Sequence, residues 1–261
     1  MHPTPLDLLA TAQTAALDAG VYLRQTWQQP RQIKSKGWRD LVTDADFESQ
    51  RLITNLIRGR FPDHAFLTEE EDLTLPEAGS IQWIIDPIDG TSNFSRQIPV
   101  FSISIAAVQN GIVLAGVIYD PLREELFSAA AGQPVTLNNQ PVQASPVNEL
   151  SNAIIAFDWS RAPAARQKTL QLVSQLAPQV HTVRAIGSAA LGLAWIACGR
   201  LDAYFNAVLK PWDVAAGLLL VQQATGQLTN LNGQTWSLAL ADQPCLVSNG
   251  HIHPALLTAI R

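Results

Sequence analysis

The sequence predicts an α+β fold in which sheets and helices are layered and a cleft separates two lobes. The first half, up to about residue 146, reads as two helices followed by antiparallel strands, whereas the second half alternates strands with helices. Such elements bury their apolar faces by stacking in layers. With 261 residues, 47% of them hydrophobic, the chain can fill a substantial core. We therefore expect lobes at 1–146 and 147–261 with a site between them.

The first half opens with two amphipathic helices. Thr4 and Pro5 are typical of a helix start, and apolar residues then recur at three- to four-residue spacing. A second helical pattern begins at about Asp44 and is stopped near Gly59. The polar, irregular segment 28–39 between them predicts a mobile basic loop.

Strands follow, first with a buried pattern and then with period two. Residues 65–68 and the run that begins at Ile81 read as apolar strands. Pro87 is expected to end the second strand at Asp86, because proline cannot donate a ladder hydrogen bond. From 100 to 125 the alternation is typical of antiparallel sheet. Turn signals in this region are Asn110-Gly111 and, further on, Asn138-Asn139.

The second half has the strand and helix alternation of an α/β unit. Its apolar runs are short and most are separated by patterns of helical period. The strand candidates are 153–157, 182–185, 203–206 and 246–248, and the helix candidates are 162–177, 188–198, 212–224 and 254–260.

Composition narrows the class of protein. A net charge of −5 and a pI near 5.5 give no dense basic face, so we expect no nucleic-acid partner. No run approaches the roughly 20 apolar residues needed to cross a bilayer, and the start is not a secretory signal, so we expect a cytoplasmic protein with no membrane contact. Cys198 and Cys245 lie in apolar stretches and are expected to be reduced core thiols.

Residues 83–94 carry the first candidate site. An apolar strand there ends in Asp86, and Asp89 follows three residues later. Gly90 and Thr91 then offer backbone N–H groups that can open a short helix. Carboxylate oxygens suit Mg²⁺, and N–H groups at a helix start suit a phosphate. The combination predicts metal-assisted phosphoryl chemistry, although Asp-Pro and Asp-Gly are also ordinary turn formers.

Further acids stand at the ends of other predicted elements. Glu69 and Glu70 follow the first short strand, and Asp213 falls in the first turn of a helix. Taken alone, Asp213 fits a helix cap and the glutamates fit a solvated loop. Joined to the aspartates of 83–94, they become a candidate metal centre.

These motifs, in this order, resemble the inositol monophosphatase family of Mg²⁺-dependent, lithium-sensitive phosphatases. Residues 83–94 resemble the family's first signature and 212–217 its second. Glu69-Glu70 resembles its paired-glutamate motif, although Thr68 stands where a glycine often precedes the pair. The resemblance covers nearly the whole chain. An element near the N-terminus also matches, through Lys36, Asp40, Leu41, Val42, Thr43 and Asp46.

The resemblance implies an α-β-α-β-α sandwich, a homodimer and a metal centre with two Mg²⁺ ions. Glu69, Asp86 and the carbonyl of Ile88 would bind the first ion, and Asp86, Asp89 and Asp213 the second. Glu69 is also available to a weaker third ion. The N-terminal lobe would thus hold metal and phosphate, and the C-terminal lobe would complete the site. Two divalent ions would balance the four carboxylates.

Catalytic and substrate roles follow from the same resemblance. Thr91, hydrogen-bonded to Asp46, and Glu69 would orient the attacking water, and no covalent intermediate is implied. Gly90 and Thr91 would donate N–H groups to phosphate oxygens. Further substrate contacts are expected from Ser188, which also reads as a plain N-cap, from Lys36, which reads equally well as a solvated lysine, and from Asn206.

Asn206 leaves the substrate open. It stands where many inositol-specific relatives have an acid, and an amide cannot supply that charge-assisted acceptor. Inositol monophosphate or a related polyol or sugar phosphate is the leading substrate. Histidinol phosphate, a fructose bisphosphate and a bisphosphate nucleotide are alternatives in the same chemistry. An alternative of another class is a regulatory binding protein that retains the fold.

Overall fold

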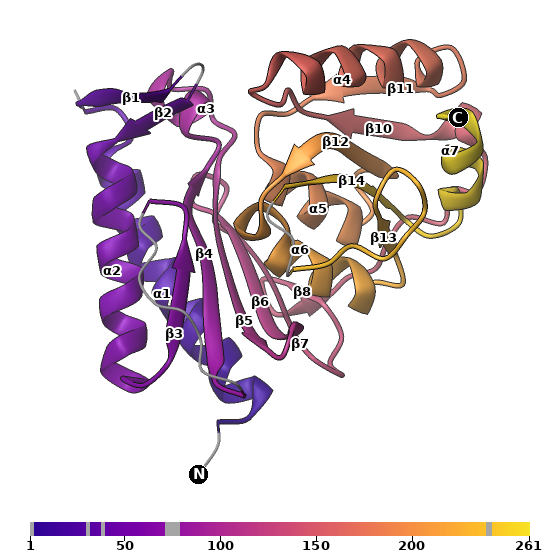
Figure 1. Cartoon of the computed structure of the whole chain (residues 1–261). Helices are drawn as coiled ribbons and strands as arrows, with labels where there is room; N and C mark the ends of the chain where they lie inside the picture. The colour runs from indigo at the N-terminus through magenta and orange to yellow at the C-terminus, as the bar shows by residue number, and fades with distance from the viewer. Residues whose placement is uncertain (1–2, 30–31, 38–39, 71–78, 239–241) are drawn as a thin grey trace.

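The structure, a computed structural model, describes residues 3–29, 32–37, 40–70, 79–238 and 242–261. Sheets and helices alternate in five layers, which confirms the predicted fold class (Figure 1). No helix among these residues is long and apolar enough to cross a membrane.

Two mixed sheets form the β layers. In the first sheet the first two strands are parallel and the others antiparallel; in the second the first three are parallel. The first sheet has the order β3 (Ala65–Thr68), β4 (Ile81–Asp89), β5 (Ser102–Gln109), β6 (Ile112–Asp120), β7 (Glu125–Ala130), β8 (Thr136–Leu137), β9 (Gln140–Pro141). The second has the order β11 (Thr182–Ala185), β10 (Ile154–Phe157), β12 (Ala203–Leu209), β14 (Gln243–Ser248), β13 (Gln227–Thr229).

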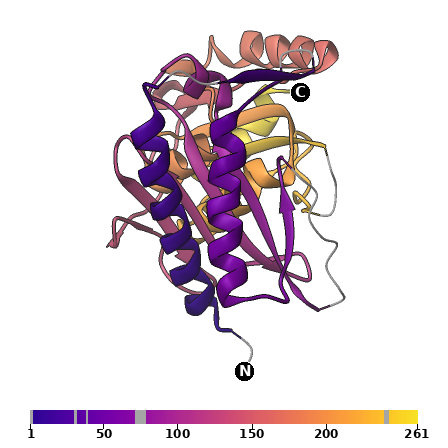
Figure 2. The ribbon, with the colours of Figure 1, turned by 90° about the vertical axis from the view of Figure 1, so that its left-hand side faces the viewer.

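Helices occupy the layers outside and between the sheets. Figure 2 shows α1 (Pro5–Thr26) and α2 (Asp44–Arg60) side by side over the outer face of the first sheet. Between the sheets lie α5 (Ala189–Ala197) and α6 (Pro211–Gln223), whereas α4 (Pro163–Leu176) and α7 (His253–Ala259) cover the second sheet from outside (Figure 1). The short α3 (Thr91–Ser95) follows β4, and a 3₁₀ turn spans Leu150–Asn152.

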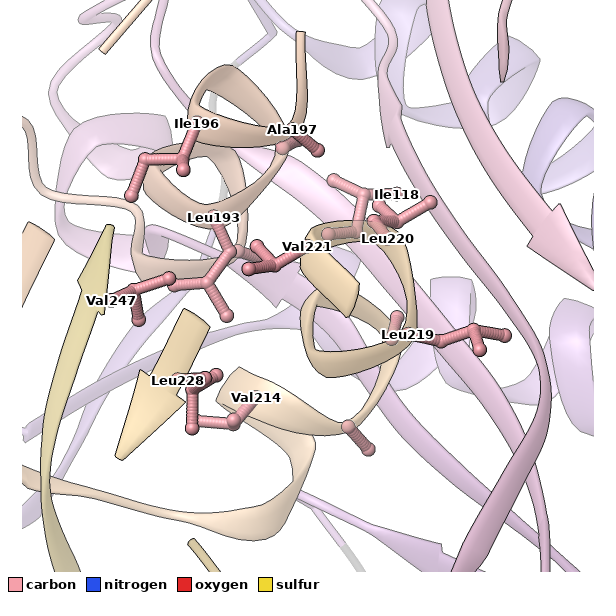
Figure 3. Close-up of a cluster of buried hydrophobic side chains, with 14 of the residues drawn as sticks. Ile118, Leu193, Ile196, Ala197, Val214, Leu219, Leu220, Val221, Leu228 and Val247 are labelled. Carbon is pink, nitrogen blue, oxygen red and sulfur yellow. The ribbon is translucent and has the colours of Figure 1, made fainter. Parts of the chain in front are cut away.

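The apolar interior consists of three clusters, one for each interface between a helical layer and a sheet or pair of sheets. The central cluster joins both sheets through the two helices between them, and Figure 3 shows its side chains meeting across α5 and α6. This cluster contains residues from both halves of the chain. The division into lobes at residue 146 stays a prediction. Labelled members are Ile118, Leu193, Ile196, Ala197, Val214, Leu219, Leu220, Val221, Leu228 and Val247.

Local signals that the sequence carries are realised. Thr4 caps α1, since its hydroxyl accepts the Asp7 N–H at 3.2 Å and its own N–H donates to Asp7 Oδ2 at 2.9 Å. Asn110 and Gly111 both have positive φ, 51° and 77°, which suits the tight hairpin between β5 and β6. Both cysteines are free thiols.

Two expectations were wrong in part, and one strand was missed. The predicted loop at 28–39 contains β1 (Ile33–Gly37), which pairs with β2 (Asp40–Thr43) as a hairpin. Its described residues are exposed, Ile33 included, so no alternation of buried and exposed positions marked the strand. Strand β4 continues past Pro87 to Asp89, and only its register with β5 shifts there. Proline thus interrupts the ladder without ending the strand. The three-residue β13 was too short to predict.

Candidate active site

A cleft of about 640 Å³ between the two sheets collects most of the predicted site residues. Its wall is formed by the end of β4, the start of α3, the loop before α4, β12 and the start of α6. We call it the active-site cleft. The predicted residues that line it are Glu69, Asp86, Ile88, Asp89, Gly90, Thr91, Asn206 and Asp213.

Three carboxylates from distant parts of the chain meet in the active-site cleft. Asp86, Asp89 and Asp213 each place an oxygen within 4.8 Å of the others. The two aspartates on β4 are almost fully shielded from solvent, with Asp86 1% exposed and Asp89 7% exposed. Asp213 lies in the first turn of α6 and accepts the Lys210 N–H at 2.8 Å, so it also caps that helix. Asp213 can therefore cap α6 and still offer a carboxylate oxygen to a metal ion.

The electrostatics of this cluster call for a cation. Burial raises the pKa of Asp86 well above its ordinary value, and the charges of Glu69, Asp89 and Asp213 raise it further. Burial also raises the pKa of Asp89 to about 6, although hydrogen bonds oppose the rise. Hard carboxylate oxygens grouped in this way fit Mg²⁺. The donor set therefore matches the implied metal.

Glu69, the fourth predicted acidic ligand, follows β3 and is held from across the cleft. Its side chain is 9% exposed, and its Oε1 lies 3.4 Å from Nη2 of Arg161, in the loop before α4. Its charge raises the pKa of the buried Asp86, and Glu69 lines the same cleft as the three aspartates.

Asp46 and Thr91, predicted as a pair, are hydrogen-bonded. Asp46 is fully buried behind the cleft, in the first turn of α2. Its Oδ2 accepts the N–H and hydroxyl of Thr43 at 2.8 and 2.6 Å, and its Oδ1 accepts the Thr91 hydroxyl at 3.0 Å. The Thr91 hydroxyl also lies 3.1 Å from the Ile88 carbonyl oxygen. Burial raises the pKa of Asp46 to about 6.

Gly90 is required by the backbone where β4 turns into α3. Its φ is 99°, in the left-handed region that favours glycine, and a Cβ there would lie 2.9 Å from the Gly187 carbonyl oxygen. Gly90 is the N-cap and Thr91 the first residue of α3, so their N–H groups have no acceptor within that helix.

Ser188 is an anchor of Asp89 and not part of the cleft wall. It is the N-cap of α5, and its buried hydroxyl donates to Asp89 Oδ2. The N–H groups of Ala189 and Ala190 donate to the same carboxylate at 3.2 and 2.8 Å. Asp89 therefore also caps α5, a helix that lies a hundred residues later in the chain.

Asn206 lines the active-site cleft but is already bound within the protein. Its Oδ1 accepts the Ser160 hydroxyl at 2.8 Å and the Val208 N–H at 3.1 Å, and its Nδ2 donates to the Tyr204 hydroxyl oxygen at 3.2 Å. Lys36 belongs to β1, and its side chain lies outside the described part of the structure.

Sequence reasoning missed a second set of residues on the opposite wall. Asp158 directly follows β10, as Asp86 ends the apolar run of β4, and this signal was visible in the sequence. Its Oδ1 accepts the N–H groups of Ile186 and Gly187, and its Oδ2 accepts the Tyr204 hydroxyl at 3.1 Å. Burial raises the pKa of Asp158 to about 7. The same wall includes Trp159, Arg161, Arg166 and Lys210.

Known proteins share both sequence and architecture with this chain. The model of the inositol monophosphatase family matches residues 5–261. An inositol-1-monophosphatase of Synechocystis sp. PCC 6803 is 36% identical over 263 residues, covering 98% of this chain and 91% of that protein. The Nus factor SuhB of Escherichia coli K12 is 36% identical over 236 residues, covering 89% of this chain and 87% of that protein.

A solved structure shares the fold of this chain. The extragenic suppressor protein SuhB of Bartonella henselae superposes with a TM-score of 0.92 at 32% identity, covering 97% of this chain and 98% of that one. The match of the family model over nearly the whole chain agrees with the shared layered architecture. This protein belongs to the inositol monophosphatase family.

Proposed function

We propose that the protein is a Mg²⁺-dependent phosphomonoesterase that hydrolyses inositol monophosphate or a related polyol or sugar phosphate. The cluster of Asp86, Asp89 and Asp213 carries this proposal. Burial and mutual repulsion raise the pKa of these carboxyl groups, so a divalent cation is the charge that the cluster lacks. Family membership supports phosphatase chemistry.

The chain offers ligands for two ions, with Glu69 and the Ile88 carbonyl beside the three aspartates. Mg²⁺ bound there supplies a Lewis acid for the phosphoryl oxygens, a lowered pKa for an attacking water and a charge that stabilises the leaving alkoxide. Glu69 is also available to a third ion. A homodimer and lithium sensitivity stay predictions from the family resemblance, and a cytoplasmic location stays a prediction from the sequence.

The residues around the cluster would orient water and phosphate. Thr91 donates its hydroxyl hydrogen to the buried Asp46, so its oxygen lone pairs are free to accept a hydrogen bond from a water in the cleft. As that water gives a proton to the Thr91 oxygen, the Thr91 hydroxyl proton would pass to Oδ1 of Asp46. The N–H groups of Gly90 and Thr91 would bind phosphate oxygens.

The test is a phosphate-release panel of inositol 1-phosphate, other polyol and sugar phosphates, histidinol phosphate, fructose bisphosphate and a bisphosphate nucleotide. We expect release with Mg²⁺ and none with EDTA. Asp213→Asn should abolish most activity, and Thr91→Ala should lower kcat by about 10²-fold or more, with Thr91→Ser partly restored. The exposed Asp18→Asn is the control. Activity that persists in EDTA would rule out the metal mechanism.

A regulatory binding protein is the second candidate, because one relative at 36% identity is named a Nus factor. The same panel separates the two. A folded protein that binds Mg²⁺ but releases phosphate from no substrate would favour the regulatory role.

A further inference from the structure

Asp158 is a buried carboxyl group in the wall of the active-site cleft that the proposed mechanism leaves unused. It directly follows β10, is 9% exposed and lines the cleft. It lies outside the acid cluster, which consists of Asp86, Asp89 and Asp213. A buried ionisable group in a cleft is a candidate for proton transfer.

The hydrogen bonds of Asp158 decide which of its oxygens can carry a proton. Oδ1 accepts the N–H groups of Ile186, at 2.9 Å, and of Gly187, so both of its lone pairs are occupied. Oδ2 accepts only the Tyr204 hydroxyl, at 3.1 Å, which leaves one lone pair open. When Asp158 is protonated, the proton is therefore on Oδ2.

The surroundings of Asp158 favour its neutral form. Burial is the main cause that raises the pKa of Asp158 to about 7; the charge of Asp89 adds to the rise, and the three hydrogen bonds oppose it. The described cations that line the cleft are held by other partners. These pairs are Arg161 with Glu69, Lys210 with Asp242 and Arg166 with the Trp159 ring.

A single residue separates Asp158 from the expected phosphate cradle. The N–H of Gly187 donates to Asp158, and the carbonyl oxygen of the same residue faces Gly90, where a Cβ would lie 2.9 Å from it. Asp158 is thus close to a phosphate held by the N–H groups of Gly90 and Thr91, without being a ligand of it.

The geometry of the displacement puts the leaving alcohol on the wall that contains Asp158. In the proposed mechanism the attacking water is on the side of Thr91 and Asp46, and an in-line displacement places the leaving oxygen on the opposite side of phosphorus. That side would face the second sheet. There β10 pairs with β12 in parallel, and the positions after their last shared pair are Asp158 and Asn206, which both line the cleft.

We propose that Asp158 is the general acid of the reaction and protonates the leaving oxygen from Oδ2. The bond between phosphorus and the leaving oxygen breaks as the proton moves to that oxygen, which leaves as the alcohol. The carboxylate that remains is stabilised by the N–H groups of Ile186 and Gly187 and by the Tyr204 hydroxyl, and it takes a new proton from solvent. This role rests on the proposed phosphatase function.

The test compares two kinds of leaving group. Wild type, Asp158→Asn and Asp120→Asn are assayed with Mg²⁺ on the best polyol phosphate of the panel and on 4-nitrophenyl phosphate. An alkoxide needs a proton to leave, whereas 4-nitrophenolate leaves without one. Asp120 is the matched control, because it is a buried carboxylate at the end of β6, outside the cleft, that also accepts two backbone N–H groups.

We expect Asp158→Asn to lower kcat on the polyol phosphate at least about 10²-fold and kcat on 4-nitrophenyl phosphate less than about threefold. Asp120→Asn should change both by the same factor. In wild type, kcat on the polyol phosphate should fall as the pH rises through the pKa of Asp158, and the 4-nitrophenyl profile should lack this fall. The wild-type comparison decides the matter even where Asp158→Asn does not fold.

The melting temperature of the metal-free protein gives a readout that needs no turnover. The folded pKa of Asp158 lies above the ordinary value of 3.8, so wild type loses stability between about pH 4 and pH 7 that Asp158→Asn does not lose. The melting temperature of Asp158→Asn minus that of wild type should therefore grow by several degrees between about pH 5 and pH 8. A difference that stays constant with pH would refute the acid, because Asp158 would then hold no proton to give.

Failure of the acid role and failure of the phosphatase function give different results. Phosphate release by wild type with an equal loss on both substrates in Asp158→Asn, or with no loss on either, would overturn the role of Asp158 alone. No release by wild type from any substrate would overturn the hydrolase function and this role together.

Discussion

Arg161 reaches from the second half of the chain to Glu69, which is a predicted metal ligand of the first half. Its guanidinium forms an ion pair with the carboxylate that the resemblance assigns to Mg²⁺. Burial raises the pKa of Asp213, and the charge of Arg161 works against that rise. In the absence of metal, Arg161 thus supplies part of the missing positive charge.

Replacing Arg161 with glutamine is expected to tighten Mg²⁺ binding, because the ion no longer competes with a guanidinium for Glu69. The pair is partly exposed and such pairs contribute little, so the gain should be at most about fivefold. Calorimetric titration of the substrate-free protein measures it. Arg51→Gln, which breaks the surface pair with Glu48 on α2, is the control. Weaker Mg²⁺ binding in Arg161→Gln would contradict this role.

The packing of α6 on β6 positions Asp213. A Cβ at Gly116 of β6 would lie 2.9 Å from the carbonyl oxygen and 3.1 Å from the Cα of Ala216, one turn after Asp213. These are backbone atoms, which cannot rotate aside. The close approach of helix and strand therefore depends on the missing side chain.

Gly116→Ala is expected to destabilise the protein by about 1–3 kcal/mol, because the added methyl group overpacks this contact. The melting temperature should fall by several degrees, and Mg²⁺ affinity should fall with it as Asp213 moves. Gly59→Ala, in α2 with no atom within 4 Å of the new Cβ, is the control. It should be neutral or stabilising by up to about 1 kcal/mol. Equal effects of both substitutions would refute the packing argument.

Elements with a strong local pattern were predictable from the sequence. The caps of α1, the hairpin at Asn110-Gly111 and the turn of β4 into α3 all follow from residues adjacent in the chain. The β1 and β2 hairpin escaped prediction because the described residues of β1 are exposed and β2 is only four residues long, with Val42 and Thr43 buried.

Most of the candidate site was predicted, including Asn206 on β12 and Asp213 on α6, but Asp158 and Trp159 were missed. Its acids stand in recognisable motifs, whereas Asp158 and Trp159 become part of the site only because β10 pairs with β12, some fifty residues later. That pairing depends on long-range burial, and no local pattern encodes it.

At the scale of the whole molecule, the buried carboxylates of the acid cluster repel one another. The free energy of unfolding should therefore depend on bound metal and on pH. The folded pKa values of Asp86, Asp89 and Asp213 lie above the ordinary value of 3.8, so the metal-free fold binds protons that the unfolded chain releases. As the pH rises above about 4, these groups therefore lower the free energy of unfolding of the metal-free protein. The loss for each group continues up to its folded pKa, which for Asp89 is about 6. Mg²⁺ has to displace the same protons.

The stabilisation by Mg²⁺ should therefore grow with pH. At a fixed Mg²⁺ concentration, the rise in melting temperature should be several degrees at pH 7.5 and smaller at pH 5.5, since about 2.7 kcal/mol is expected at 100 times the dissociation constant. Differential scanning fluorimetry with NaCl at matched ionic strength measures it. Asp213→Asn should lose most of the rise. A larger effect of Mg²⁺ at pH 5.5 would contradict the charge argument.

Asp89 has consequences for how such chains diverge. One carboxylate belongs to the acid cluster and also holds the start of α5 through Ser188, Ala189 and Ala190. A relative without phosphatase activity would still gain from Asp89 and Ser188, because their hydrogen bonds stabilise the start of α5. The presence of Asp89 in a relative is therefore weak evidence that the relative is a phosphatase.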